Sequence, residues 1–133
     1  MGGWLVPTYR PITYERTLRD PRPPVASPTL EHLHLGRRTV ELEYSWNLGA
    51  GRQTALETVL HRLQGDLGKQ IAREGEVMAV LRPFLAMRVL GVIPLGEMSA
   101  HDAMLCCAKL AEIRDPDLTL TELAASTLVR TAP

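Results

Sequence analysis

The chain has 133 residues, enough for one domain with its own hydrophobic core and too few for two sizeable domains. Its 45% hydrophobic and 23% charged residues are typical of a globular protein. Fifteen Lys and Arg side chains balance fifteen Asp and Glu side chains, so the net positive charge that draws proteins to nucleic acids and anionic membranes is absent.

Residues 1–28 form a proline-rich arm. They hold six of the ten prolines, which remove backbone donors and keep the chain extended, so neither a helix nor a central strand is expected. The start, MGGWLVPTYRP, lacks the basic segment and apolar core of a signal peptide. A solvated linker has no use for aromatic side chains. We therefore predict that the arm binds a protein surface, on the same chain or a neighbouring one, through Trp4, Tyr9, Tyr14, Arg10 and Arg16.

The next segment predicts an antiparallel β-hairpin over 29–46. The stretch TVELEYSW alternates strictly and puts four apolar or aromatic side chains on one face: Val40, Leu42, Tyr44 and Trp46. TLEHLHL before it is a weaker strand candidate, and GRR at 36–38 has the length of a hairpin connection.

The loop that follows, GAGRQT at 49–54, raises the question of a phosphate site. It lacks the lysine of a P-loop and the third glycine of a dinucleotide fingerprint. The strand before it is also half-exposed, whereas such loops follow buried parallel strands. A turn with a helix start is the favoured interpretation, and an anion site built from Gly51, Arg52 and Thr54 is the alternative.

A helix is predicted over 54–73, because apolar residues recur there at spacings of three and four, ending at Ile71. Thr54 and Glu57 have the spacing of a capping box at its start.

The apolar run 77–95 is interrupted by Arg82, Pro83 and Arg88, which argues against a membrane span. Pro83 and Gly91 would bracket a short helix over 83–90, since proline favours helix starts and glycine helix ends. A pair of buried strands is the alternative for this run.

Two further helices are predicted over 99–113 and 119–130, with Ser99 and Asp102 capping the first and Thr119 and Glu122 capping the second. The only cysteines, Cys106 and Cys107, are adjacent and cannot readily form a disulfide. Their apolar neighbours predict inert thiols in the core. Because the two cysteines form no disulfide, we expect a reducing compartment, the cytoplasm or a virion in a host cytoplasm.

Two groups of residues resemble catalytic or metal sites without completing one. Ser99, His101 and Asp102 carry the side chains of a triad, but residues on one helical turn point in different directions, so capping explains them better. His32 and His34 would share one face of a strand, as some metal ligands do, but nothing in the sequence nominates a third ligand. We therefore predict no catalytic residues, no metal and no cofactor.

The C-terminal stretch MLCCAKLAEIRDPDLTLTELAASTLV resembles the end of small tail assembly chaperones and related tail proteins of bacteriophages. In these an apolar helix precedes a DP-x-LT-x-E turn into a final helix. The hairpin LGRRTVELEYSWN before a helix is similar to their start. The proline-rich arm departs from that pattern and resembles the tethering arms of virion components.

Together these features predict an α+β protein, mainly α. It would have an arm over 1–28 and one domain over 29–133 with a hairpin and three to four helices. We expect a non-catalytic assembly or structural protein whose partners are copies of itself or other subunits. The resemblance implies a component or assembly factor of a phage tail or virion. The alternatives are a small enzyme or ligand-binding domain that uses the 49–54 loop, and a nucleic-acid binder that uses the arm arginines with Arg37 and Arg38.

Overall fold

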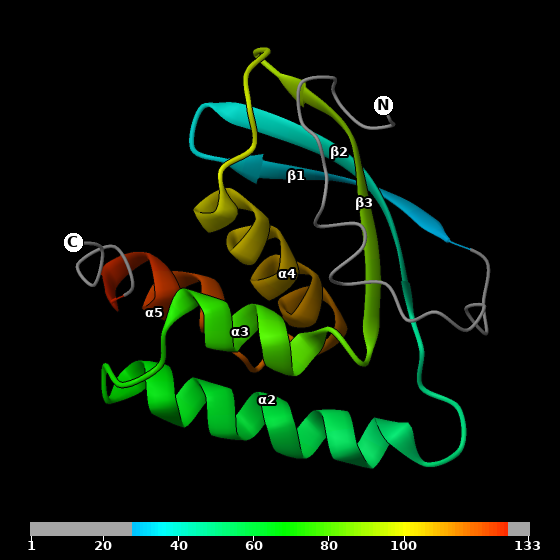
Figure 1. Cartoon of the computed structure of the whole chain (residues 1–133), viewed down its shortest axis with the longest axis vertical. Helices are drawn as coiled ribbons and strands as arrows, with labels where there is room; N and C mark the ends of the chain where they lie inside the picture. Colours follow the sequence, from blue (N-terminus) through cyan, green and yellow to red (C-terminus); the bar gives the residue numbers. More distant parts are fainter. Residues whose placement is uncertain (1–27, 128–133) are drawn as a thin grey trace.

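A three-stranded antiparallel sheet and four helices make up residues 28–127, the part of the chain that the computed structural model describes (Figure 1). The predicted α+β class is confirmed. The arm, with Trp4, Tyr9, Arg10, Tyr14 and Arg16, lies outside the described residues, as do residues 128–133. The elements in chain order are β1 (Thr29–Leu35), β2 (Arg38–Trp46), α2 (Arg52–Gly68), α3 (Glu74–Leu81), β3 (Leu85–Ile93), α4 (Ala100–Arg114) and α5 (Leu120–Thr127).

The hairpin predicted over 29–46 is confirmed. β1 and β2 pair without interruption from Thr29 opposite Tyr44 to Leu35 opposite Arg38. Gly36 opens the connection with a φ of 64°, a value that glycine adopts without steric cost. The alternation places Val40 and Leu42 in the core, while the opposite face of the hairpin carries the polar side chains.

The segment predicted as a helix over 83–90 is instead the start of β3, a single strand that pairs with β2 and completes the order β1-β2-β3. Pro83 lies in the turn before this strand, and Gly91 pairs with Glu41 within it. The pairing skips one residue of β3 between Val89 and Gly91. This bulge keeps the inward side chains on one face, so Val89 and Val92 are both buried.

The helices lie on one side of the sheet, with α4 nearest to β1, and α2 and α3 run side by side further from the strands (Figure 1). α4 is the central helix and contacts β1, α3 and α5, which explains why it is apolar on nearly every side. Seven of its residues are buried: Ala103, Met104, Cys106, Cys107, Ala108, Leu110 and Ala111. One continuous core therefore joins the sheet to all four helices of the described part.

The bounds of α2 differ from the predicted 54–73. The helix begins two residues earlier, after Gly51 as N-cap with a φ of 79°, so Thr54 lies inside the first turn and does not cap it. It ends at Gly68, followed by Gln70 with a φ of 61°. This early end leaves Ile71 outside the helix and 61% exposed, although the sequence pattern placed it on the buried stripe.

The predicted start of α4 is confirmed, because Ser99 accepts a hydrogen bond from the Asp102 amide at 3.0 Å. At the start of α5, the side chain of Gln64 accepts the Thr119 amide hydrogen at 2.7 Å. That contact joins α5 to α2.

No helix among residues 28–127 is long and apolar enough to cross a bilayer.

Candidate functional site

The loop at 49–54 is organised around Arg52. The guanidinium donates through Nε to the Asn47 carbonyl at 2.9 Å and through Nη2 to the Pro83 carbonyl. It also lies over the Phe84 ring, 5.0 Å from its centroid. Gly51, Arg52 and Thr54 thus sit together at the start of α2, as the anion-site alternative requires. Their one cation, however, is directed toward carbonyl oxygens and fastens the loop to the turn before β3.

Ser99, His101 and Asp102 point to three different partners. The Ser99 hydroxyl caps α4, and Asp102 Oδ2 forms an ion pair with Arg38 Nη1 at 2.8 Å. His101 Nδ1 lies 2.8 Å from Glu74 Oε2, at the start of α3. These contacts join α4 to the hairpin and to α3, and they do not assemble a nucleophile with a base.

Arg38 holds the hairpin turn against the start of α4. Besides the ion pair with Asp102, its Nη2 donates to the Glu97 carbonyl at 2.8 Å. No sequence pattern described above predicts this role. The signal that could have suggested it is a basic residue at the start of an otherwise acidic strand.

His32 and His34 of β1 also have local partners. His32 Nε2 lies 3.4 Å from Glu41 Oε2, and His34 Nδ1 lies 3.2 Å from the Thr39 hydroxyl. His61 is exposed on α2. Within residues 28–127 no group of three or more His, Cys, Asp or Glu side chains is arranged to hold a metal ion.

Cys106 and Cys107 are free and fully buried on α4. Burial raises the pKa of the Cys106 thiol well above its usual value and raises the pKa of the Cys107 thiol to about 12. Because the thiolate is the reactive form, these thiols are inert in the folded protein near neutral pH.

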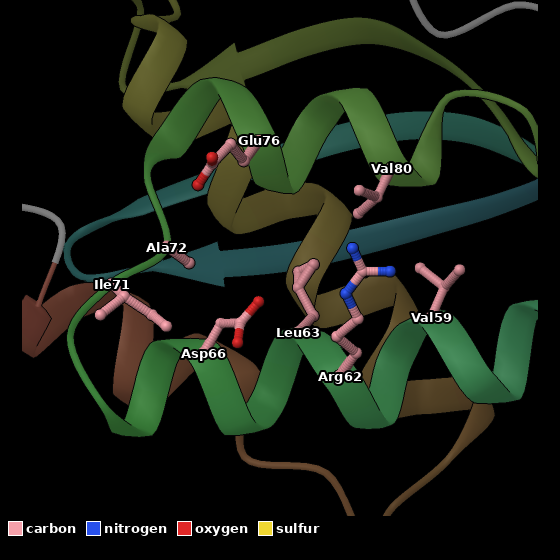
Figure 2. Close-up of a pocket in the computed structure, with 8 residues that line it drawn as sticks. All are labelled: Val59, Arg62, Leu63, Asp66, Ile71, Ala72, Glu76 and Val80. Atoms are coloured by element: carbon pink, nitrogen blue, oxygen red, sulfur yellow. The ribbon is translucent and has the colours of Figure 1, made fainter.

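A first groove lies between α2 and α3 and has a volume of about 280 Å³. Figure 2 shows Arg62 and Asp66 of α2, and Glu76 and Val80 of α3, directed toward the space between the helices. The other lining residues are Val59, Leu63, Ile71 and Ala72. Since Leu63 and Ala72 are buried and Ile71 is exposed, the groove has an apolar floor, a charged rim and an exposed isoleucine at one end.

A second, more open groove of about 350 Å³ follows the free edge of β1, where α4 runs alongside it. Its strand side is formed by four consecutive residues, Glu31 to His34, whose side chains alternate between the two faces of the sheet. Side chains from both faces of the sheet can line one groove only where that groove runs along the edge of the strand. Its helix side is formed by Lys109, Glu112 and Ile113.

Within this second groove, Glu112 is already engaged, because its Oε2 accepts the Thr121 amide hydrogen at 2.6 Å and so binds the start of α5. Ile113, in contrast, is 48% exposed at the rim. The groove thus combines strand backbone with an exposed aliphatic side chain.

No protein-family model, no curated protein and no solved structure matches the chain. The resemblance to bacteriophage tail proteins therefore stays a prediction.

Proposed function

We propose that this chain is a non-catalytic assembly or structural protein that acts through protein-protein contacts. The observation that supports it is the exposure of isoleucine at the rim of both grooves, 61% for Ile71 and 48% for Ile113. An exposed apolar side chain beside a groove offers a partner an apolar contact that binding would bury.

The distribution of polar side chains agrees with this proposal. Arg38, Arg52, His101 and Asp102 include the groups best suited to chemistry or anion binding, and each is bonded to another part of the fold. Their contacts position the elements that form the two grooves. A catalytic role would need some of these groups to converge on a shared cavity instead.

The particular assembly we propose is a phage tail or virion, as a component or as an assembly factor acting in the host cytoplasm. The layout of hairpin, helix, apolar α4 and the DP turn into α5 supports this choice. The two free, buried thiols agree with a reducing compartment. Copies of the same chain or other subunits of the particle would be its partners.

The test is the solution mass of the full-length chain, measured by light scattering over a range of concentrations. We expect an oligomer that dissociates in Ile71→Glu or Ile113→Glu variants, because a buried carboxylate in a contact is costly. Ile93→Glu is the matched control, since Ile93 is 68% exposed and lines neither groove. A monomer at every concentration, with no partner bound from the same particle, would contradict the proposal.

A version that starts at Val25 separates the arm from the grooves. If the arm engages a neighbouring subunit, this version should be monomeric while its circular dichroism remains that of the folded protein. An unchanged oligomer would assign the contact to the grooves alone.

A further inference from the structure

The two edges of the sheet are not equivalent. β1 pairs with β2 in unbroken register, and among residues 28–127 nothing pairs with its other edge. Alternate residues of such an edge strand direct both N–H and C=O away from the sheet, where another strand can bind them. β3, the opposite edge, contains the bulge at Leu90, a feature that disfavours further pairing.

The arm contains one segment that can act as a strand. Ile12 to Asp20, ITYERTLRD, is the longest stretch without proline within residues 1–28, so every residue in it keeps its backbone donor. The segment is rich in β-branched and aromatic residues. As a strand it would have one mainly apolar side and one polar side: Ile12, Tyr14, Arg16 and Leu18 on the first, Thr13, Glu15, Thr17 and Arg19 on the second.

We propose that Ile12–Asp20 of one copy adds as a strand to the free edge of β1 in a second copy, a case of β-augmentation. This inference rests on the proposed assembly function and names its contact. The apolar side would face α4 and cover Ile113. The polar side would continue the outer face of the sheet, next to His32 and His34.

The charges of the groove are compatible with this direction. Arg16 falls on the side of the segment that faces α4, and Glu31 on β1 points to that same side, because it shares the parity of the buried Leu33. Lys109, also in the groove, has the same charge as Arg16 and would repel it. If the segment turned its other side toward α4, its apolar side would lie against the histidines and Ile113 would stay exposed.

The spacer between the segment and β1 favours a second copy over the same chain. Residues 21–28 contain four prolines, and the residues before them are also held extended. A polyproline II spacer of this length spans about 25 Å at ~3.1 Å per residue. An antiparallel strand on β1 of its own chain would require the two ends of this spacer to lie within about 5 Å of each other. A parallel strand would require a crossover connection of about a dozen residues or more, and only eight residues separate the segment from β1. The proline content of this spacer therefore favours the β1 of a second copy.

Cysteine cross-linking in the full-length chain tests the pairing. A His32→Cys protein is mixed with each of seven proteins that carry one new cysteine at positions 13 to 19, and disulfide-linked heterodimers are measured. The native thiols do not interfere, since both are buried. We expect alternate positions, on the polar side, to cross-link several-fold more than their neighbours, because a strand has a period of two. Ala26→Cys, in the spacer, is the background control.

Three outcomes would overturn the inference. If a protein that carries both cysteines forms the disulfide within one chain, and the mixed proteins form none, the segment pairs with its own β1. An oligomer with uniform or absent cross-linking would reject strand addition and leave the assembly function standing. A monomer in light scattering would contradict strand addition between copies, and a monomer that also binds no partner from the same particle would contradict the assembly function as well.

A matched pair of proline variants gives an independent measurement. A Thr17→Pro, Leu18→Pro double variant removes donors at two successive positions, one of which must face β1, and we expect it to shift the full-length chain from oligomer to monomer. Ala26→Pro adds a proline to a spacer that already has several, so it should leave the mass unchanged. Equal effects of both variants, or none, would contradict the pairing.

Discussion

Each end of the sheet is held by one arginine, but by different chemistry. At the hairpin-turn end, Arg38 forms an ion pair with Asp102 and donates to the Glu97 carbonyl. At the other end, where β2 finishes and β3 begins, Arg52 donates to two carbonyls and lies over the Phe84 ring. The first contact depends on a partner's charge, whereas the second depends on backbone dipoles and a ring. Only the first should respond clearly to salt.

The Arg52 end should contribute more to stability. Arg52→Ala would remove two hydrogen bonds and the ring contact together, and we expect the free energy of unfolding to fall by about 2 kcal/mol. Urea denaturation followed by circular dichroism measures it. Arg82→Ala, an exposed arginine beside the same turn, is the control and should change stability little. Equal losses in the two variants would mean that Arg52 acts only through its general charge.

At the Arg38 end we expect a smaller loss, about 1 to 1.5 kcal/mol for Arg38→Ala, because the side chains of Arg38 and Asp102 are 30% and 19% exposed and solvent screens them. A double-mutant cycle with Asp102→Ala isolates their coupling. Repeating the cycle in high salt should reduce that coupling. A coupling that salt leaves unchanged would show that the two ends do not differ as described.

Capping at the same end is the next smaller effect. Ser99→Ala removes the acceptor of the Asp102 amide hydrogen and should cost about 1 kcal/mol. Ser99→Asn, which keeps an acceptor, should restore most of the loss. Denaturation midpoints of both variants measure this, and failure of the asparagine to rescue would point to a cause other than the cap.

The two ends also differ in how far the sequence could predict them. The Ser99 cap and the alternation of β2 are local signals, and both predictions are confirmed. The same kind of local signal gave a wrong result at Pro83 and Gly91, where pairing of β3 with β2, a strand far earlier in the chain, decides the structure. Thr54 does not cap α2, because the helix already begins after Gly51, which is its N-cap and has a positive φ.

Arginine contacts lay beyond sequence reasoning for a physical reason. Arg52 bonds to a carbonyl of Pro83, and Arg38 to a carboxylate of Asp102, so each partner is known only once the chain has folded. The residues that line the grooves are likewise known only once the chain has folded. The edge of β1 becomes a candidate contact only when the strand order is known, and Ile71 becomes exposed only because α2 ends at Gly68.

The buried thiols of α4 give the finest test of the difference between the two ends, because they become reactive only when this helix opens, either by itself or with the whole protein. With the pKa of Cys107 raised to about 12, a thiol reagent near neutral pH can react only through molecules in which α4 has opened. Asp102 lies one turn before Cys106, so loss of its ion pair should loosen that turn. We expect Arg38→Ala to speed the reaction several-fold and Arg52→Ala to speed it less, although Arg52→Ala costs more stability overall. If the reaction rates followed global stability instead, α4 would open only with the whole protein, and the two ends would belong to one cooperative unit.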